Sequence, residues 1–286
     1  MSEERKMSER STEHRMIGII VPTTDNTFFS NLADYAAEYL YEKGFSALIL
    51  SSNNDAQREK DHLRCLLELG VEGILCVSGL SVLPDDLIPD GFPMVCLDRH
   101  PETGRNIPLV ANDDREAMFK ATDYLVSKGC KSIVLMPGYL AEKRTSPRVT
   151  GYEEALIQHG ITPDPEYILD RPGRKSSELE TEELVGQIMQ KGLPVDAVIT
   201  ASDRAAFGVI TALHRVGLYV PEDVKLISFD NSPYSSMASP AITALDRNPR
   251  ELAETAGKCL LDMIEGRTVK ERTIIPVSVC LRDSTR

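Results

Sequence analysis

Short apolar runs alternate with amphipathic stretches along most of the chain, and a glycine follows nearly every amphipathic stretch. The apolar runs have the length and the β-branched or leucine-rich content of buried strands, and the stretches between them repeat apolar residues at helical spacing. Glycine marks the predicted helix ends because it adopts the left-handed cap conformation without steric cost. The predicted strands are Ile17–Val21, Ala47–Leu50, Gly73–Val77, Met94–Leu97, Ser132–Met136, Ala197–Thr200 and Val224–Phe229, and the predicted helices end at Gly44, Gly70, Gly129, Gly160, Gly192 and Gly217.

This alternation predicts an α/β fold with parallel sheets, helices on both faces of each sheet and right-handed crossovers. The rhythm breaks between Ser78 and Asn112, where the helical pattern fades and prolines recur, and it restarts at Asp113. We therefore expect two Rossmann-like lobes joined near residue 112. A cleft between two such lobes is a common ligand site that closes by a hinge.

Composition narrows the class of protein. The 286 residues include 44 acidic and 32 basic side chains, giving a net charge of −12, so most of the surface should repel the phosphates of nucleic acid. No segment has the roughly 20 apolar residues of a membrane helix, so no membrane partner is expected. Residues 1–15 are strongly polar and lack the apolar stretch of a signal peptide, which predicts a disordered lead, native or left from cloning, on a cytoplasmic protein.

Six cysteines stand singly in apolar stretches, without a C-x-x-C pair or a histidine at metal-ligand spacing. They are expected to be reduced core residues, and no metal site is predicted. Pro22-Thr23-Thr24-Asp25 follows the first strand where a dinucleotide-binding protein has its glycine-rich loop. Because Walker, H-E-x-x-H and G-x-S-x-G motifs are missing as well, we predict neither a cofactor nor catalytic residues.

Polar and aromatic side chains follow the predicted strands, at the sheet edge where ligands of open α/β sheets bind. Carboxylates, a guanidinium and amides can bond vicinal hydroxyls, and a phenyl ring can stack on a sugar or a base. Arg148 and Asp230 are the strongest candidates, because strand and helix ends place them at the crevice mouth, facing water. The predicted ligand-binding residues are Phe28, Asp98, Arg148, Ser202 and Asp230.

Several neighbouring residues also have structural interpretations. Asp203 is the expected N-cap of the helix that begins with Arg204, and Asp25 or Asn26 could cap the helix after the first strand. Phe29 could belong to the core. Asp98 and Arg99 could form a local ion pair rather than a binding site.

Motifs spread from Ile17 to Thr285 resemble the LacI/GalR family of bacterial transcription regulators. Val220-Pro221-Glu222-Asp223-Val224 continuing to Phe229-Asp230 is similar to a signature of that family, as is Arg148-Val149-Thr150-Gly151-Tyr152. The opening strand with Asn26-Thr27-Phe28-Phe29 resembles the aromatic effector loop of the family, with Thr27 where proline is usual. Further matches are Ser51-Ser52-Asn53-Asn54-Asp55 with Glu59, Leu69-Gly70-Val71-Glu72-Gly73-Ile74 and Leu281-Arg282-Asp283-Ser284-Thr285.

The resemblance implies a type I periplasmic-binding-protein-like fold, with three crossovers, an effector site between the lobes and a homodimer. The expected division is residues 16–112 with 246–268 for one lobe and 113–245 with 269–286 for the other. Leu63, Leu66 and Leu67, together with the segment 73–83, are expected at the dimer interface. Ser202 departs from the asparagine often found at that position, and the helix-turn-helix of the family is not found in this sequence.

These observations predict the effector-binding core of a LacI-type regulator, not an enzyme, whose lobes close on a sugar, sugar phosphate or nucleoside. Operator DNA would be bound only through a helix-turn-helix outside this sequence. A solute-binding protein of a sugar ABC importer is the main alternative, and a sugar-modifying enzyme is a third interpretation.

Overall fold

The structure is a computed structural model that describes residues 15–138, 146–169 and 178–286; the predicted polar lead, apart from its last residue, lies outside this range. The chain divides into two compact units and passes between them three times. The N-terminal lobe comprises Met1–Ala111 and Pro249–Thr273, and the C-terminal lobe comprises Asn112–Asn248 and Ile274–Arg286. The sequence predicted lobe boundaries after residues 112, 245 and 268. In the structure the lobes divide after residues 111, 248 and 273.

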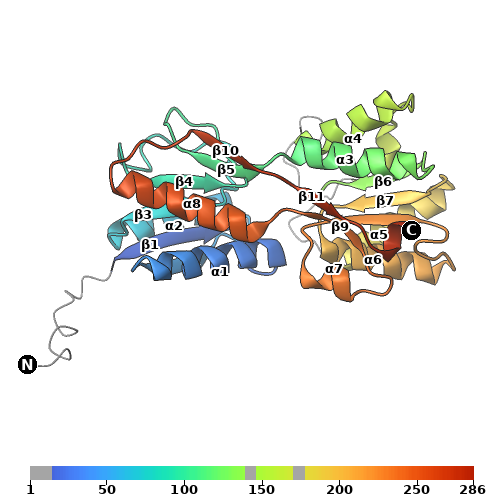
Figure 1. Cartoon of the computed structure of the whole chain (residues 1–286), viewed down its shortest axis with the longest axis horizontal. Helices are drawn as coiled ribbons and strands as arrows, with labels where there is room; N and C mark the ends of the chain where they lie inside the picture. The colour runs from blue at the N-terminus through green and yellow to red at the C-terminus, as the bar shows by residue number, and fades with distance from the viewer. Residues whose placement is uncertain (1–14, 139–145, 170–177) are drawn as a thin grey trace, which may run out of the picture. The chain divides into compact units, whose positions relative to one another are not determined.

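The N-terminal lobe is built on a six-stranded sheet in the order β10-β5-β4-β3-β1-β2 (Figure 1). The pairs from β2 to β5 are all parallel, because a helix or a long crossover returns the chain to the same end of the sheet. The strands are β1 (Met16–Val21), β2 (Ser46–Ser51), β3 (Gly73–Cys76), β4 (Met94–Leu97), β5 (Leu109–Asn112) and β10 (Arg272–Ile275).

Three long helices flank this sheet: α1 (Thr27–Glu42), α2 (Ala56–Glu68) and α8 (Pro249–Ile264). Leu63 and Leu66 of α2 pack in one cluster with Ile74 and Cys76 of β3. The alternate strand residues point to the opposite face, where α1 and α8 pack against each other and on the sheet. The lobe therefore has three layers.

The C-terminal lobe is built on a five-stranded sheet in the order β11-β9-β8-β7-β6, in which only the described pair β11–β9 is antiparallel. The strands are β6 (Ile133–Met136), β7 (Ala197–Thr200), β8 (Lys225–Phe229), β9 (Thr243–Asp246) and β11 (Ser278–Cys280). The helices are α3 (Asp114–Ser127), α4 (Pro147–Gln158), α5 (Glu178–Lys191), α6 (Asp203–Arg215) and the short α7 (Pro233–Met237), with 3-10 turns at Pro165–Tyr167 and Asp283–Thr285.

Alternate residues of these strands enter two separate hydrophobic clusters. Ile199 and Ile227 pack with α3 and α4, whereas Val198 and Leu226 pack with α5 and α6. Helices thus cover both faces of the sheet, and the predicted α/β fold class with parallel sheets is confirmed. All six glycines that were expected to end helices have positive φ angles, from 69° to 90°.

The structure corrects three expectations. The short strands β5, β9, β10 and β11 were not predicted. Cys65 is exposed rather than a core residue, although all six cysteines are free as expected. Leu63 and Leu66 are completely buried inside their own lobe and β3 is an interior strand, so these residues do not form the exposed apolar surface expected of a dimer interface.

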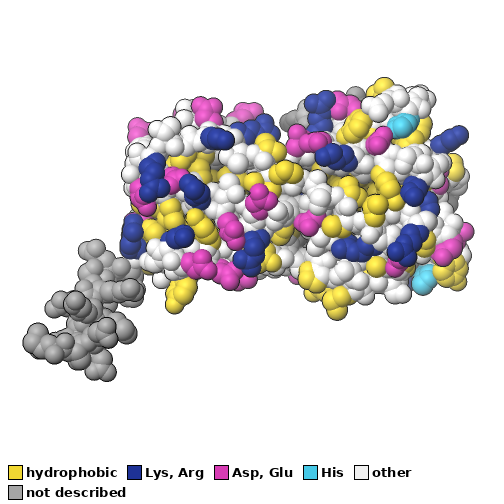
Figure 2. All heavy atoms as spheres, viewed as in Figure 1, with side chains coloured by type: hydrophobic (Ala, Val, Ile, Leu, Met, Phe, Trp, Pro, Cys, Tyr) yellow, Lys and Arg dark blue, Asp and Glu magenta, His cyan; other side chains and the backbone are white. Residues whose placement is uncertain are grey.

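Lysine and arginine side chains are scattered among aspartate and glutamate on the face of the protein shown in Figure 2. Among the described helices, none is both long enough and apolar enough to cross a membrane.

Candidate functional site

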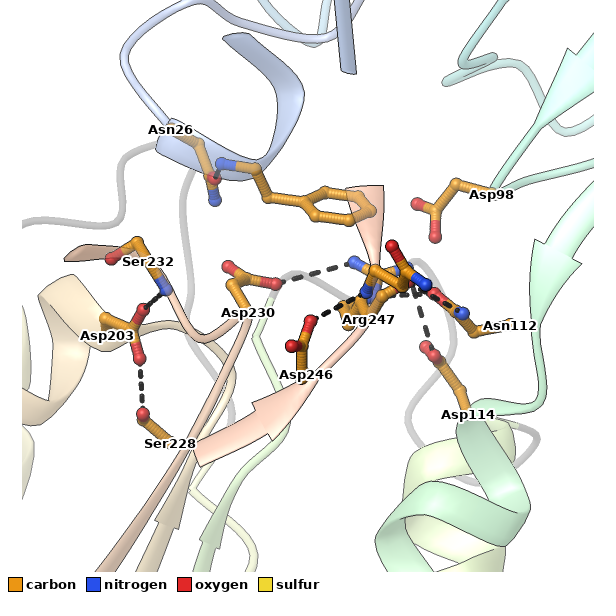
Figure 3. Close-up of polar contacts among 12 residues, drawn as sticks. Asn26, Asp98, Asn112, Asp114, Asp203, Ser228, Asp230, Ser232, Asp246 and Arg247 are labelled. Carbon is orange, nitrogen blue, oxygen red and sulfur yellow. Dashed lines mark hydrogen bonds and ion pairs between the residues drawn. The ribbon is translucent and has the colours of Figure 1, made fainter. Parts of the chain in front are cut away.

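The carboxyl end of the C-terminal sheet carries a buried charge cluster around Arg247, the residue that follows β9 (Figure 3). Its guanidinium lies 3.6 Å from the Asp230 carboxylate and 4.0 Å from the Asp114 carboxylate. Its Nε donates a hydrogen bond of 3.1 Å to Asn112 Oδ1. The side chains of Arg247 and Asp230 are only 3% and 5% exposed, so this ion pair compensates two charges where little water reaches them.

Asn112 ties together the three segments in which the chain passes between the lobes. Besides accepting from Arg247, its amide donates to the Arg247 carbonyl at 3.1 Å and to the Ile275 carbonyl at 2.9 Å. These three residues lie beside the three boundaries between the lobes, and they are joined through one side chain. The connecting strands of this protein are therefore cross-linked by hydrogen bonds.

Arg148 occupies the first turn of α4 and is held on three sides. Its Nε donates to Asp114 Oδ2 at 2.8 Å, its Nη1 donates to the Pro137 carbonyl at 3.3 Å, and its guanidinium stacks 4.1 Å from the centre of the Phe229 ring. Arg247 lies 5.8 Å from the same ring centre. Phe229 and Asp114 therefore each contact both guanidiniums, which fixes the two arginines relative to one another.

Close packing of α4 on α3 brings Arg148 to Asp114. A Cβ atom built on Gly151 would lie 2.1 Å from the Arg115 carbonyl oxygen, so only glycine allows the two helices to approach this closely. Gly151 stands in the same motif as Arg148. The motif thus combines a charged side chain with the glycine that positions its helix.

The loop after β8 has an unusual backbone. Asp230 and Asn231 have φ angles of 96° and 53°, a region that residues other than glycine occupy at a cost of about 1–3 kcal/mol each. In the N-terminal lobe Asp98, which follows β4, has a φ of 63°. A residue keeps such a conformation only where the surrounding structure holds it, and residues of this kind cluster at ligand sites. Two of the five predicted ligand residues, Asp98 and Asp230, share this feature.

Asp203, the first residue of α6, binds both ends of the loop between β8 and α7. Its carboxylate accepts hydrogen bonds from the Ser228 hydroxyl and, at 2.5 Å, from the Ser232 amide. Burial raises the pKa of this carboxyl, although these hydrogen bonds and the charge of Arg282 act in the opposite direction. The expectation that Asp203 is the N-cap of α6 is wrong: Ser202 is the N-cap, and its Oγ accepts from the Ala205 amide at 3.2 Å.

The N-terminal lobe presents an aromatic set at the end of β1. Asn26 caps α1 by accepting from the Phe28 amide at 2.8 Å, so the second of the two expected caps is correct. The rings of Phe28 and Phe29 are buried and meet edge to face at 5.3 Å. Arg99 lies 5.5 Å from the Phe29 ring and 3.5 Å from the Asp98 carboxylate. Phe29 is a core residue, and the local ion pair of Asp98 with Arg99 is present.

Glu59 on α2 is a second buried carboxylate that binds a loop. It accepts from the Ser78 hydroxyl at 2.5 Å and from the Gly79 amide at 2.7 Å. Burial raises the pKa of Glu59. Burial also raises the pKa of the Cys76 and Cys96 thiols, and the nearby Glu59 charge acts in the same direction on both. Glu59 thus fixes the loop after β3 in the way that Asp203 fixes the loop after β8.

Two expectations about the site were incomplete. Arg148 and Asp230 were expected to face water, but their side chains are 15% and 5% exposed and each is bound to an opposite charge. Sequence reasoning also missed Asn112, Asp114 and Arg247. The same strand-end rule would have found Asn112 and Arg247 if β5 and β9 had been recognised, because both residues stand at carboxyl ends. Among the described residues, no group of three His, Cys, Asp or Glu side chains could hold a metal ion.

Comparison with known proteins adds the family. Residues 122–285, more than half of the chain, match the periplasmic binding protein-like domain. The chain belongs to the periplasmic binding protein-like domain family. Among curated members, it is 28% identical to the HTH-type transcriptional repressor PurR of Vibrio atlanticus (strain LGP32), over 90% of this chain and 77% of the repressor. It is 25% identical to the ribose operon repressor of Halalkalibacterium halodurans, over 97% of this chain and 82% of that protein.

Solved structures of the same fold include proteins with bound ligands. A periplasmic binding protein/LacI transcriptional regulator from Alkaliphilus metalliredigens, complexed with D-xylulofuranose, has a TM-score of 0.83 and 26% identity, covering 95% of this chain and 99% of that one. A LacI family regulator from Enterococcus faecium with bound ribose has a TM-score of 0.81 and 26% identity, covering 95% and 98%. The resemblance to the LacI/GalR family and the periplasmic-binding-protein-like fold are therefore confirmed.

Proposed function

We propose that this chain is the effector-binding and dimerisation core of a bacterial LacI-type transcription regulator, which closes its lobes on a small polyhydroxylated ligand. The observation that carries the proposal is the set of buried charged groups at the carboxyl ends of β6, β8 and β9: Arg148, Asp230 and Arg247. Contacts within the protein fix the geometry of these side chains before a ligand arrives. Such preorganisation is needed where a ligand must bind before the lobes close around it. The repressor names of the relatives support the regulatory role.

The charge balance of the C-terminal lobe favours an uncharged ligand, a sugar or a nucleoside, over a sugar phosphate. Two guanidiniums, those of Arg148 and Arg247, are already compensated by the carboxylates of Asp114 and Asp230. Asp246 adds a further carboxylate, which accepts from Asn231 at 3.1 Å. A phosphate would have to displace a carboxylate from its arginine, whereas hydroxyl groups can bond to the remaining donor and acceptor positions.

We assign ligand contacts to Phe28, Asp98, Arg148, Ser202 and Asp230. Carboxylates of Asp98 and Asp230 would accept from hydroxyl groups, and Arg148 would donate to a ligand oxygen. The Phe28 ring is buried in this structure, so it would stack on the ligand only where ligand binding uncovers it. The hydroxyl of Ser202 already accepts a helix-capping bond, so its contribution would come through its remaining donor capacity. The structures solved with D-xylulofuranose and with ribose support a ligand of this class.

Two other functions use the same fold. A solute-binding protein of a sugar ABC importer would have similar lobes, but the relatives are transcriptional repressors and the cysteines are free, which favours a cytoplasmic regulator that is not an enzyme. A sugar-modifying enzyme would require an acid and a base poised against a substrate, whereas Asp230 and Asp114 are engaged with arginines.

A thermal-shift screen of D-ribose, D-xylulose, other neutral sugars, nucleosides and sugar phosphates tests the ligand class. A ligand at about a hundred times its Kd should stabilise the wild type by about 2.7 kcal/mol. Arg148→Ala should weaken binding more than tenfold, because a hydrogen bond to a charged group contributes about 1.5–3 kcal/mol. Arg115→Ala, at an exposed ion pair in the same lobe, is the control and should bind as the wild type does. Stabilisation by sugar phosphates alone would contradict an uncharged ligand.

We further propose that the protein is a homodimer and that operator DNA is bound only by a helix-turn-helix outside this sequence. The net charge of −12 opposes binding of duplex DNA by the core itself. Sedimentation should give twice the chain mass of 31.7 kDa at tens of micromolar protein, and a monomer would contradict the dimer. Salt-dependent, sequence-specific retention of a palindromic operator by residues 1–286 would contradict the second proposal.

A further inference from the structure

The strained loop that carries Asp230 is bound from its far side by an arginine near the end of the chain. Arg282 Nη2 donates to the side-chain oxygen of Asn231 at 2.6 Å. Its Nη1 donates to the Ile242 carbonyl at 2.7 Å and to Ser235 Oγ at 3.3 Å. One planar guanidinium thus joins the loop after β8 to the segment that enters β9, a geometry that a lysine could not reproduce.

Arg282 is itself held firmly. Its amide donates to Thr243 Oγ1 at 2.9 Å. Two residues later, Ser284 Oγ accepts from the Thr243 amide at 2.8 Å and donates to the Leu226 carbonyl at 2.5 Å. These bonds attach the last turn of the chain to both β8 and β9. The terminal segment is therefore a rigid support for the guanidinium.

Asn231 connects this support to the charge cluster. Its Nδ2 donates to Asp246 Oδ2 at 3.1 Å, while its Oδ1 accepts from Arg282. Asp246 directly precedes Arg247, the ion-pair partner of Asp230. The φ angles of 96° and 53° at Asp230 and Asn231 are intrinsically unfavourable. The loop therefore keeps this conformation because neighbouring contacts, such as those of Asn231, hold it.

We propose that Arg282 is a positioning residue of the ligand site, acting through the Asn231 carboxamide to hold Asp230 in its binding conformation. This inference rests on the proposed function for the role of Asp230, but the contacts that carry it lie within the C-terminal lobe. Arg282 does not touch the ligand. It determines affinity by keeping the loop ordered before the ligand arrives, so the binding free energy is not spent on ordering it.

Hydrogen–deuterium exchange of the ligand-free protein tests the positioning role without any ligand. In Arg282→Leu the amides of residues 230–236 should exchange at least tenfold faster than in the wild type, while peptides of α3 and α4 remain unchanged. Arg286→Leu removes the same charge four residues later from a side chain that is 79% exposed, and it should leave the loop unchanged. Unaltered exchange in Arg282→Leu would overturn the proposal.

A double-mutant cycle tests whether Arg282 acts through Asn231. With D-ribose as the probe, or D-xylulose if ribose does not bind the wild type, Arg282→Leu and Asn231→Gly should each weaken binding about tenfold. Glycine is chosen because it accepts the positive φ angle without strain. If both substitutions break one connection, the double variant should bind within about twofold of the single variants. Losses that multiply to about a hundredfold would overturn the proposal.

The two experiments separate this inference from the proposed function. If no probe binds the wild type but the loop of Arg282→Leu exchanges faster, the positioning role is supported and the assignment of the ligand class fails. If a probe binds wild type and Arg282→Leu equally well, with unchanged exchange, the ligand class stands and the positioning role is overturned.

Discussion

The two lobes use the same device at their carboxyl edges, a buried helix carboxylate that binds the loop after a strand. Glu59 accepts from Ser78 and from the Gly79 amide in the N-terminal lobe, and Asp203 accepts from Ser228 and from the Ser232 amide in the C-terminal lobe. The lobes differ in what the loop carries. The loop after β3 continues into apolar residues, whereas the loop after β8 carries Asp230, whose charge meets Arg247.

The two lobes also differ in the chemistry of the side chains at their carboxyl edges. Buried charges in the C-terminal lobe form a network in which each arginine contacts a carboxylate and the Phe229 ring. In the N-terminal lobe the segment after β1 carries the buried Phe28 and Phe29 rings, and the loop after β4 carries the ion pair between the neighbours Asp98 and Arg99. The C-terminal lobe thus carries interlocked charges at its carboxyl edge, whereas the N-terminal lobe carries packed aromatic rings and a single local ion pair.

The largest expected effect is that of Arg247→Leu. Removing this guanidinium breaks the buried ion pair with Asp230 while the Asp230 carboxylate stays buried, which should lower the free energy of unfolding by about 3–5 kcal/mol. Arg250→Leu in the N-terminal lobe is the matched comparison, because that side chain is 53% exposed and water screens its pairs with Glu38 and Glu254, so the loss should be much smaller. Urea denaturation of both variants measures the contrast. Equal losses would show that burial does not distinguish these arginines.

Next in size are the losses expected for Glu59→Ala and Asp203→Ala. Each substitution leaves a buried serine hydroxyl, that of Ser78 or Ser228, without its carboxylate acceptor and also removes the acceptor of a loop amide, at a cost of about 1–3 kcal/mol. Glu59→Gln and Asp203→Asn retain one acceptor oxygen and add a donor, so they should recover most of the stability. Urea midpoints of the four variants test the equivalence of the two lobes, and a large loss in only one lobe would contradict it.

A smaller effect is expected from the helix caps. Ser202→Ala and Asn26→Ala each remove a side chain that accepts a hydrogen bond from a free amide in the first turn of a helix, Ala205 of α6 or Phe28 of α1, which costs about 0.5–2 kcal/mol. Both residues also stand at strand ends. Ser202→Gly and Asn26→Gly should lose only about a few tenths of a kcal/mol, because glycine is tolerated at the cap position. Thermal melts without ligand would show a structural contribution from both residues if the prediction holds.

The smallest effect concerns pH. Burial raises the pKa of Asp203 above its ordinary value of 3.8, so the folded protein keeps a proton at pH values where the unfolded chain has released it. The contribution of this group to stability is therefore greatest at low pH and is lost as the pH rises from 3.8 through the raised pKa of the folded state.

Asp203→Asn removes this term, so the stability of the wild type relative to the variant should fall as pH rises through that window and then level off. Glu59→Gln should behave in the same way above its ordinary value of 4.5, because burial raises that pKa as well. Denaturation curves at pH 4 to 7 provide the measurement. A wild type that gains stability relative to either variant as pH rises would mean that the hydrogen bonds outweigh burial.

The sequence by itself determined the α/β class, the seven longer or more apolar strands, and the glycines that end the helices. These features depend on neighbouring residues alone. Hydrophobic periodicity determines whether a segment forms a helix or a strand, and the positive φ angle needed at a helix end favours glycine there. It also placed Arg148, Asp230 and Asp98 at strand or helix ends, because a ligand site at the carboxyl edge of a parallel sheet follows from topology alone. The short strands β5, β9, β10 and β11 were not recognised, because each includes a polar or charged residue and lacks the uninterrupted apolar run that identified strands of the same length such as β4 and β6.

Only the tertiary structure decided what each charge contacts. Asp230 was expected to face water, yet the adjacency of β8 and β9 brings it to Arg247, and Arg247 meets Asn112 from 135 residues away in the sequence. Leu63 and Leu66, expected at a subunit interface, pack inside their own lobe. Burial and ion pairing depend on the order of strands in a sheet and on the approach of helices to it, and no local pattern of residues contains that information.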